Sequence, residues 1–133
     1  MAKQIFVNLP VNDLVKSKAF FEALGYSFNA QFTNEDAACM VISDTIYTML
    51  LTKPFFEKFT SKEVVDAKKS TEVLVCLSAD SRAEVDEIVA KAVAAGGRIY
   101  NEPQDHGFMY AHSFEDLDGH QWEFAYMEPS HIQ

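Results

Sequence analysis

Positively charged residues are scarce in this sequence, which limits the partners that the chain can bind. It contains 11 Lys and Arg against 20 Asp and Glu, giving a formal net charge of −9. Nucleic acids and anionic membranes attract clustered Lys and Arg. We therefore expect no nucleic acid and no membrane among its partners.

Cysteines, paired histidines and long apolar runs are also rare. Cys39 and Cys76 lie far apart without a CxxC motif, which is typical of free thiols in a reducing compartment. The four histidines form no HxxxH pair. No segment resembles a signal peptide or a membrane span, so we expect a cytoplasmic protein.

Apolar residues are plentiful, at 48% of 133 residues, including 11 Phe. This composition argues against disorder. A chain of this length can form one domain that buries roughly two thirds of the surface exposed by its unfolded form.

The segment 109–127, MYAHSFEDLDGHQWEFAYM, reads as strand, turn, strand. Asp118-Gly119 predicts the turn, because Gly accepts the positive φ of a tight hairpin. Beyond it, an aromatic face is formed by Trp122, Phe124 and Tyr126. Glu123 points to the opposite face, where its carboxylate is either solvated or lines a cavity.

The first half of the chain predicts a strand, a helix, a strand and a hairpin. We expect these at residues 5–10, 12–24, 26–32, and 38–42 with 46–51. Segment 53–70 predicts one or two short helices, with a capping box at 60–63. We interpret its phenylalanines as local core packing, with a ligand lid as the alternative; they are Phe55, Phe56 and Phe59.

The second half predicts the same order again. We expect a strand at 71–78, a helix that starts at the capping box 81–84 and ends at Gly96-Gly97, a strand at 98–101, a polar loop at 102–107, and the closing hairpin. The helix carries an apolar stripe of Val85, Ile88, Val89, Ala92 and Val93.

The repeated order predicts an α+β fold of two βαβββ modules, with curled mixed sheets around a cavity and helices outside. Module 1 spans about 1–52, a helical linker 53–70, and module 2 about 71–128. The halves align with 6–9 on 72–75, and with Gly25 on Gly96.

Two motifs resemble the vicinal oxygen chelate superfamily, which includes glyoxalase I, extradiol dioxygenases, fosfomycin-resistance enzymes and bleomycin-binding proteins. One is LPVND at 9–13, leading into SKAFFEALG at 17–25. The other is FEDLDGHQWEF at 114–124, similar to FxDPDGNxxEL, with Leu117 in place of Pro. The closing motif resembles a bacterial subgroup labelled lactoylglutathione-lyase-like.

The resemblance implies one metal ligand on the first strand and one on the last strand of each module. Module 2 offers Glu72 and Glu123, whereas module 1 offers Phe6 and either Met49 or Leu50. The three module 1 side chains cannot bind Ni, Zn, Fe or Mn usefully. We therefore expect no tightly bound cofactor. If a divalent metal binds, the weak candidate ligands are Glu72, Glu123 and His112.

Glu72 and Glu123 are also the candidate catalytic residues, as a general acid/base pair. The alternative is two solvated carboxylates. Cys76 is expected on the face of Glu72, as a small buried filler or a reactive thiol. We expect His106 to be solvated and His120 to be a turn residue.

Two functions remain open. One is a glyoxalase I-like lyase with an incomplete metal site, acting on a small molecule. The other is a non-catalytic binding protein of the bleomycin-resistance type, whose acidic chain suits a cationic ligand. We expect a homodimer, because the Phe-rich linker offers apolar surface that a small monomer rarely exposes.

Overall fold

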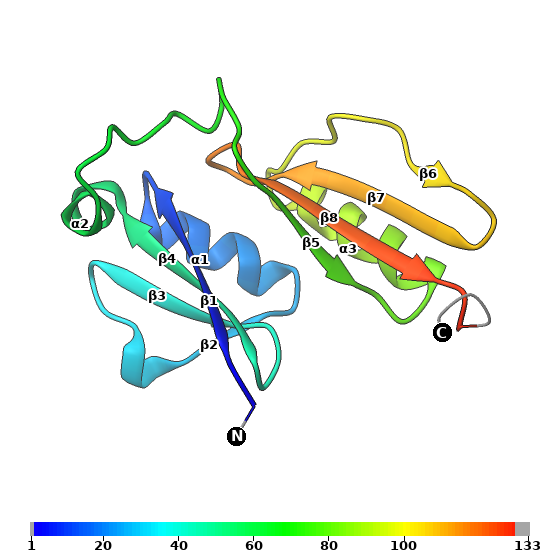
Figure 1. Cartoon of the computed structure of the whole chain (residues 1–133), viewed down its shortest axis with the longest axis horizontal. Coiled ribbons are helices and arrows are strands. Elements are labelled where there is room, and N and C mark those ends of the chain that lie inside the picture. Colours follow the sequence, from blue (N-terminus) through cyan, green and yellow to red (C-terminus); the bar gives the residue numbers. More distant parts are fainter. Residues whose placement is uncertain (1, 130–133) are drawn as a thin grey trace. The chain divides into compact units, whose positions relative to one another are not determined.

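A computed structural model describes residues 2–129 of the chain. The chain divides between Val64 and Val65 into two compact units, which we call module 1 and module 2. Each unit holds a four-stranded mixed sheet and one long helix, so the predicted α+β fold of two βαβββ modules is confirmed (Figure 1).

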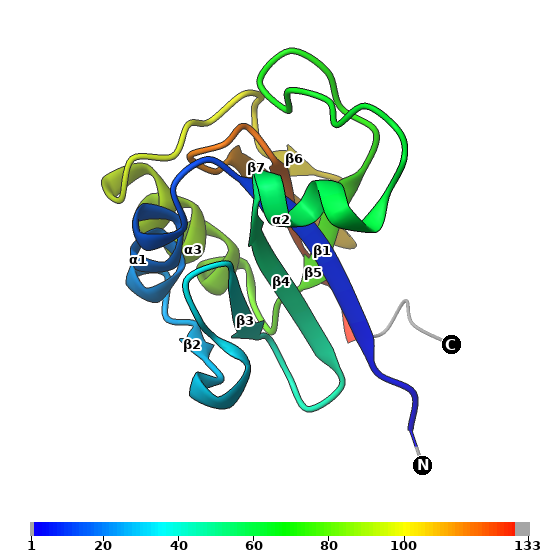
Figure 2. The same cartoon turned by 90° about the vertical axis from the view of Figure 1, so that its left-hand side faces the viewer.

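Module 1 contains β1 (Ile5–Val11), α1 (Leu14–Ala23), β2 (Ser27–Phe28), η1 (Ala30–Phe32), β3 (Ala37–Val41), β4 (Ile46–Thr52), α2 (Lys53–Phe56) and η2 (Glu57–Phe59). Its strand order is β1-β4-β3-β2, with β1 parallel to β4 and the other pairs antiparallel. The edge position of β1 tolerates Pro10, which has no backbone N–H to donate. Figure 2 shows α2 directly after β4, beside β1.

Helix α1 lies within the predicted segment 12–24 and begins and ends slightly inside it, at Leu14 and Ala23. The Asp13 carboxylate accepts a hydrogen bond from the Lys16 backbone N–H at 3.1 Å, which caps the first turn. Gly25, at φ 106°, follows the last turn in the left-handed conformation that favours glycine. Phe20 and Phe21 are its largest buried side chains.

Module 2 contains β5 (Leu74–Ser78), α3 (Arg82–Ala94), β6 (Gln104–Asp105), β7 (Met109–Glu115) and β8 (Gln121–Met127), in the strand order β5-β8-β7-β6. The predicted capping box is present: Ser81 Oγ accepts from the Glu84 N–H at 3.0 Å. The Glu84 carboxylate accepts in turn from the Asp80 N–H at 2.7 Å. Val85, Val89 and Ala92 are the buried residues of the predicted stripe.

The predicted hairpin of β7 and β8 is present, but residues 116–120 connect it instead of a two-residue turn. Asp116 organises this loop. Its Oδ1 accepts from the N–H groups of Asp118 and His120 at 2.9 and 3.0 Å, and its Oδ2 accepts from Trp122 Nε1 at 3.0 Å. His120 is thus a turn residue, as expected. Gly119 has φ 91°, and a Cβ there would lie 2.8 Å from the Lys68 backbone N.

Two predicted strands are wrong. Only Ser27–Phe28 of 26–32 forms a strand, because the Asn29 side chain accepts from the Gln31 N–H and caps the short helix η1. In 98–101, Arg98 alone bridges to Glu115. The loop predicted at 102–107 instead contributes the strand β6.

The segment between the modules also differs from prediction. Its first part forms α2 and η2, but no helix follows the capping box at 60–63, where Thr60 Oγ1 accepts from the Lys62 N–H in a local turn. The strand predicted from residue 71 begins only at Leu74. None of the linker phenylalanines is fully buried, and Phe59 is 70% exposed, so core packing is wrong for that residue.

No helix within residues 2–129 is both long enough and apolar enough to cross a membrane.

Candidate functional site

Helix caps and strand pairing give the correspondence between the two modules. Asn8 lies five residues before the N-cap Asp13, and Cys76 lies five residues before the N-cap Ser81. Asn8 is the register partner of Met49, which partners Cys39. Cys76 is likewise the partner of Glu123, which partners Ser113. The row Asn8–Met49–Cys39 in module 1 thus corresponds to the row Cys76–Glu123–Ser113 in module 2.

This correspondence corrects the predicted alignment of the halves by two residues. Phe6 matches Leu74, and Glu72 lies two residues earlier, in a bend outside β5. A shift of two residues keeps every side chain on the same sheet face, so alternation could not reveal the error. The partner of Glu123 on β5 is Cys76, and the structure does not bring Glu72 to that row. The sequence left Met49 and Leu50 as alternatives for the last strand of module 1, and Met49 is the one that matches Glu123.

The corrected positions give a poor metal site. The four positions at which the resemblance implies metal ligands hold Phe6, Met49, Leu74 and Glu123, of which only Glu123 offers a carboxylate. His112 does not complete this set of metal ligands. Its register partner is Phe124, and both side chains belong to the sheet face opposite Glu123. Within residues 2–129, no group of three or more His, Cys, Asp or Glu could hold a metal ion. The residues present do not fit a transition metal.

The module 2 row carries polar chemistry on the sheet face of Glu123. Ser113 Oγ donates a hydrogen bond to Asn101 Oδ1 at 2.7 Å. A small pocket of about 30 Å³, enough for roughly one water molecule, is lined by Asn101, Glu102, Gln104, Ala111, His112, Ser113 and Glu123. The Glu123 side chain is half-buried and forms none of the ion pairs among the described residues.

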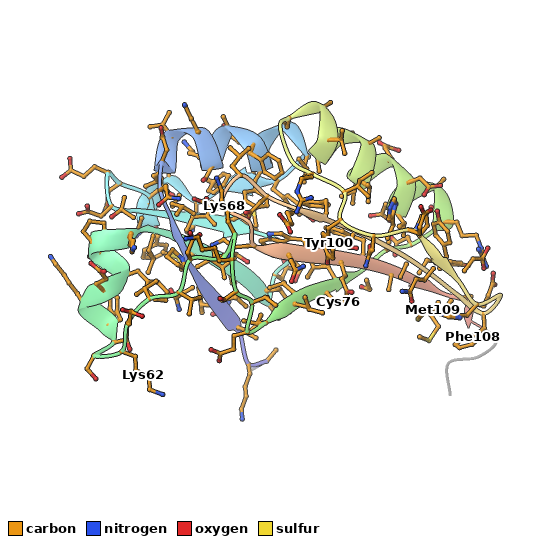
Figure 3. All side chains as sticks on the ribbon, turned by 90° about the horizontal axis from the view of Figure 1, so that it is seen from above. Lys62, Lys68, Cys76, Tyr100, Phe108 and Met109 are labelled. Carbon is orange, nitrogen blue, oxygen red and sulfur yellow. The ribbon has the colours of Figure 1, made fainter. Side chains whose placement is uncertain are left out.

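Cys76 is exposed on this face, so the expectation of a buried filler is wrong (Figure 3). Partial burial raises the pKa of the Cys76 thiol, and the nearby Glu123 carboxylate raises it further. A thiol that stays protonated at neutral pH is a weak nucleophile. A reactive thiol is therefore disfavoured here.

Tyr100 belongs to this cluster, although sequence reasoning did not single it out. Burial raises the pKa of its hydroxyl, a hydrogen bond with the Ser113 hydroxyl opposes this, and the carboxylates of Glu123 and Glu115 raise the pKa further. Arg98 forms an antiparallel bridge with Glu115, and alternate residues of an extended segment face the same way. Tyr100, two residues after Arg98, therefore lies opposite Ser113, two residues before Glu115.

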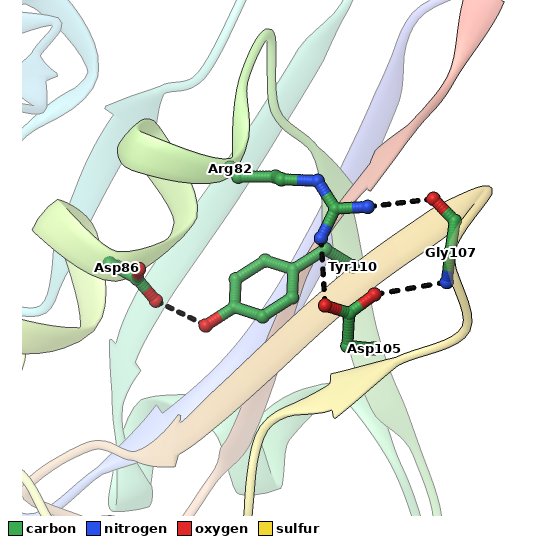
Figure 4. Close-up of polar contacts among 5 residues, drawn as sticks. All are labelled: Arg82, Asp86, Asp105, Gly107 and Tyr110. Atoms are coloured by element: carbon green, nitrogen blue, oxygen red, sulfur yellow. Dashed lines mark hydrogen bonds and ion pairs between the residues drawn. The ribbon is translucent and has the colours of Figure 1, made fainter.

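Polar contacts at the opposite end of the sheet hold β6 in place (Figure 4). Arg82 forms an ion pair with Asp105 at 3.0 Å and donates to the Gly107 carbonyl at 2.7 Å. The pKa of Asp105 is lowered by the Gly107 N–H and by Arg82. Tyr110 donates to Asp86 on α3 at 2.5 Å, which raises the pKa of the tyrosine. These contacts tie the pocket-lining β6 to the start of α3.

Module 1 has a larger and less polar pocket of about 370 Å³. It is lined by Asn8, Leu51, Phe56, Phe59 and Thr60. Phe59 also contacts Phe55 edge to face, with ring centroids 5.3 Å apart. Small-molecule sites are typically concave, mostly apolar and about 300–1,000 Å³ in volume. This pocket has that size and composition.

Of the remaining predicted residues, Glu72 and His106 line neither pocket, whereas His112 lines the small pocket with Glu123. Glu72 is exposed, and His106 is exposed as expected. His112 is half-buried on β7, and its Nε2 atom is buried without a hydrogen-bond partner in the structure. The catalytic role of Glu72 and Glu123 stays a prediction.

Comparison with known proteins gives one family match and several related folds. Residues 3–43 match the model described as bleomycin resistance protein-like N-terminal. A hypothetical protein from S. aureus is 30% identical over 95% of both chains, with a TM-score of 0.79. A glyoxalase-related enzyme from Fulvimarina pelagi is 19% identical over 95% of this chain and 88% of its own, with a TM-score of 0.79. No curated protein matches.

The fold and the two pockets define a two-module βαβββ protein with the features of a small-molecule site. A fosfomycin resistance protein from Mesorhizobium loti shares this fold at 13% identity, covering 98% of this chain and 96% of its own, with a TM-score of 0.70. Residues 3–43 are thus similar to the N-terminal part of bleomycin resistance-like proteins, and the whole chain shares the fold of proteins described as glyoxalase-related and fosfomycin-resistance proteins.

Proposed function

We propose that this protein binds a small organic molecule without a metal ion, in the manner of bleomycin-resistance proteins. The observation that carries the proposal is the apolar pocket of about 370 Å³ in module 1. Leu51, Phe56 and Phe59 provide its apolar walls, and Asn8 and Thr60 provide polar groups that can orient a ligand.

Charge and ligand chemistry support the same proposal. Three of the four positions at which the resemblance implies metal ligands hold Phe6, Met49 and Leu74, so binding has to depend on organic contacts. A net charge of −9 attracts cations over long range. The expected ligand is therefore an organic cation with an apolar portion.

Calorimetry in metal-free buffer with benzyltrimethylammonium, a small organic cation that carries an aromatic ring, tests this function. We expect binding that a chelator does not change and that Phe59→Ala weakens, because the truncated side chain removes one apolar wall. Phe32→Ala is the matched control, since Phe32 is also exposed in module 1 but does not line the pocket. Binding that requires added metal, or that both variants weaken equally, would contradict the proposal.

A second candidate is an enzyme that removes a proton next to a carbonyl, as a lactoylglutathione-lyase-like protein would. The observation in its favour is that a carboxylate base, Glu123, lies near a hydroxyl donor, Tyr100. The assay is turnover of methylglyoxal with glutathione, with and without added Ni or Zn. Turnover that Glu123→Gln abolishes would support the enzyme, and absence of turnover in every condition would reject it.

We also propose that the protein pairs with a second copy of itself. The partly exposed Phe-rich segment around Phe59 supports this, because isolated monomers rarely expose such apolar surface. Light scattering at micromolar concentration should give the mass of a dimer, and a monomer mass would reject the proposal.

A further inference from the structure

The pocket of about 370 Å³ in module 1 is open toward the segment that follows β4. Asn8 and Leu51 belong to the sheet, whereas the other lining residues belong to that segment; they are Phe56, Phe59 and Thr60. Phe59 is 70% exposed, and Thr60 is exposed beside it. Small-molecule sites typically bury roughly 70–90% of a drug-sized ligand. Such burial in this pocket requires the wall around Phe59 to move inward.

The segment that forms this wall has few attachments to the rest of the protein. Its helices α2 and η2 contain no buried residue. Among residues 2–129, residues 57–64 form no hydrogen bond or ion pair with any residue outside 53–64. The aromatic contacts are internal as well: Phe59 packs edge to face on Phe55, and the Lys58 ammonium lies 5.7 Å from the Phe55 ring centroid. These contacts can therefore move together as one unit.

The two ends of the segment differ in how they are attached. Helix α2 continues directly from β4, which is paired with β1 on one side and β3 on the other, and Pro54 restricts the backbone in its first turn. After η2, no helix or strand follows before β5 (Figure 2). The next anchored point is the turn in which the Ser70 N–H donates to the Asp66 carbonyl at 3.0 Å. Residues 61–65 thus form an irregular tether.

We propose that residues 53–60 form a lid that closes over a ligand bound in the module 1 pocket. The inference rests on the proposed function, because the lid acts on the ligand of that same pocket. Segments with few buried contacts open and close more readily than the core of a protein, as ligand-binding loops do. Closing buries the exposed Phe59 ring against the apolar portion of the ligand, which stabilises the closed form. Asn8 and Leu51 stay fixed on the sheet.

Limited digestion by a protease that cuts after glutamate follows the lid. Glu57 lies in the lid and Glu63 in its tether, whereas Glu35 and Glu102 lie in other connecting segments and serve as reference sites; all four are exposed. Such a protease recognises a carboxylate, so an organic cation does not compete with its substrate. Digests of the full chain with and without benzyltrimethylammonium would use one protein concentration, so that any pairing of two copies contributes equally. Mass spectrometry gives the cutting rate at each site.

We expect the ligand to protect the lid selectively. At a free ligand concentration ten times the Kd, cutting after Glu57 and Glu63 should slow by about tenfold, because only the open form is cut. Cutting after Glu35 and Glu102 should not change. Unchanged cutting after Glu57 and Glu63 in the presence of bound ligand would overturn the inference, and so would equal slowing at all four sites.

A tether variant separates a moving lid from a fixed wall. Ser61→Gly changes an exposed residue that does not line the pocket, and it gives the open tether more conformations. It should weaken benzyltrimethylammonium binding by roughly two- to fivefold in calorimetry. Ser70→Gly is the matched control, because it makes the same change at an exposed residue of the Asp66 turn, and it should bind as the wild type does. Circular dichroism would verify that both variants are folded.

Equal binding by the two glycine variants would also overturn the lid, because a fixed wall does not depend on the tether. The proposed function fails separately. If benzyltrimethylammonium binds and Phe59→Ala weakens this binding, but cutting after Glu57 and Glu63 is unchanged, only the lid is rejected. If calorimetry detects no binding by the wild type, the proposed function is rejected and the lid with it.

Discussion

The two modules share one scaffold but carry different chemistry at matching positions. Module 1 places Met49 and buried Cys39 where module 2 places Glu123 and Ser113. Beside them, module 1 stacks Phe6 on Tyr47, with ring centroids 4.8 Å apart. The pairing of the strands depends on backbone hydrogen bonds that any side chain permits, so a repeat can keep its architecture while one half becomes apolar and the other stays polar.

Loop contacts also differ between the modules, and the largest expected effect lies there. A Cβ at Gly119 would lie 2.8–2.9 Å from the backbone of Ala67 and Lys68, whereas one at Gly25 would meet nothing within 4 Å. Gly119→Ala should lower the free energy of unfolding by about 3 kcal/mol, through backbone strain and steric overlap. Gly25→Ala should lower the free energy of unfolding by only about 1 kcal/mol, since the positive φ is the sole source of strain at that position.

Urea unfolding measures this difference. Trp122 is the only tryptophan, so its fluorescence follows module 2, while far-ultraviolet circular dichroism follows both modules. Equal destabilisation by the two substitutions would show that the close approach of the 67–68 backbone to Gly119 does not matter.

The hairpin loops give the second prediction. Asp116→Ala removes the acceptor of three hydrogen bonds, including that of the buried Trp122 indole, and should cost about 2 kcal/mol. Ser43→Ala in the module 1 hairpin removes two exposed bonds, to the N–H groups of Thr45 and Ile46, and should cost below about 1 kcal/mol. Urea titrations of both variants would test the ranking.

Asp116 should also make stability depend on pH. Burial raises the pKa of its carboxyl, which outweighs the opposing effects of His120 and of the Trp122 hydrogen bond. A raised pKa means that the folded state holds this proton more tightly than the unfolded state. The stabilisation is therefore complete below the ordinary aspartate pKa of about 3.9 and is lost as the pH rises through the folded-state value. Asp116→Asn should abolish this part of the dependence of unfolding free energy on pH, as measured by urea titrations at several pH values. An unchanged dependence in the variant would show that another group causes it.

Exchanging the central residues of the two rows gives a smaller effect. Met49→Glu places a carboxylate on a half-buried apolar face and should destabilise the protein by about 1–3 kcal/mol. Glu123→Met should be neutral or stabilising, because it removes a half-buried charge that has no ion-pair partner among the described residues. Denaturant midpoints of the two variants would decide. A large loss of stability in Glu123→Met would show that the carboxylate supports the fold.

The smallest effect concerns the stacked pair of module 1. A double-mutant cycle with Phe6→Leu and Tyr47→Leu should give a coupling of about 0.5–1.5 kcal/mol, as expected for an aromatic contact. The corresponding pair in module 2, Leu74 and Gln121, should show less coupling in a cycle of alanine substitutions. Equal coupling in both modules would mean that the aromatic rings add nothing beyond strand pairing.

The sequence by itself determined the features that depend on short-range chemistry. The capping box at 81–84, the glycines at 96–97 and the alternation around Trp122 predicted the second helix and the closing hairpin, and the repeated order of elements predicted the two modules. The wrong strand predictions also had local causes. Competing side-chain bonds, such as that of Asn29, ended the strand predicted over 26–32.

Only the tertiary structure decided which residues share the candidate site. Strand register relates residues far apart in the chain, and a slip of two preserves alternation, so Leu74 rather than Glu72 matches Phe6. Tyr100 joined the site because segment 98–101 runs beside β7, although only Arg98 bridges to it. The hydrogen bond between the Tyr100 and Ser113 hydroxyls likewise joins two segments that only packing brings together. Packing of that kind brings together residues from separate segments, which no local pattern records.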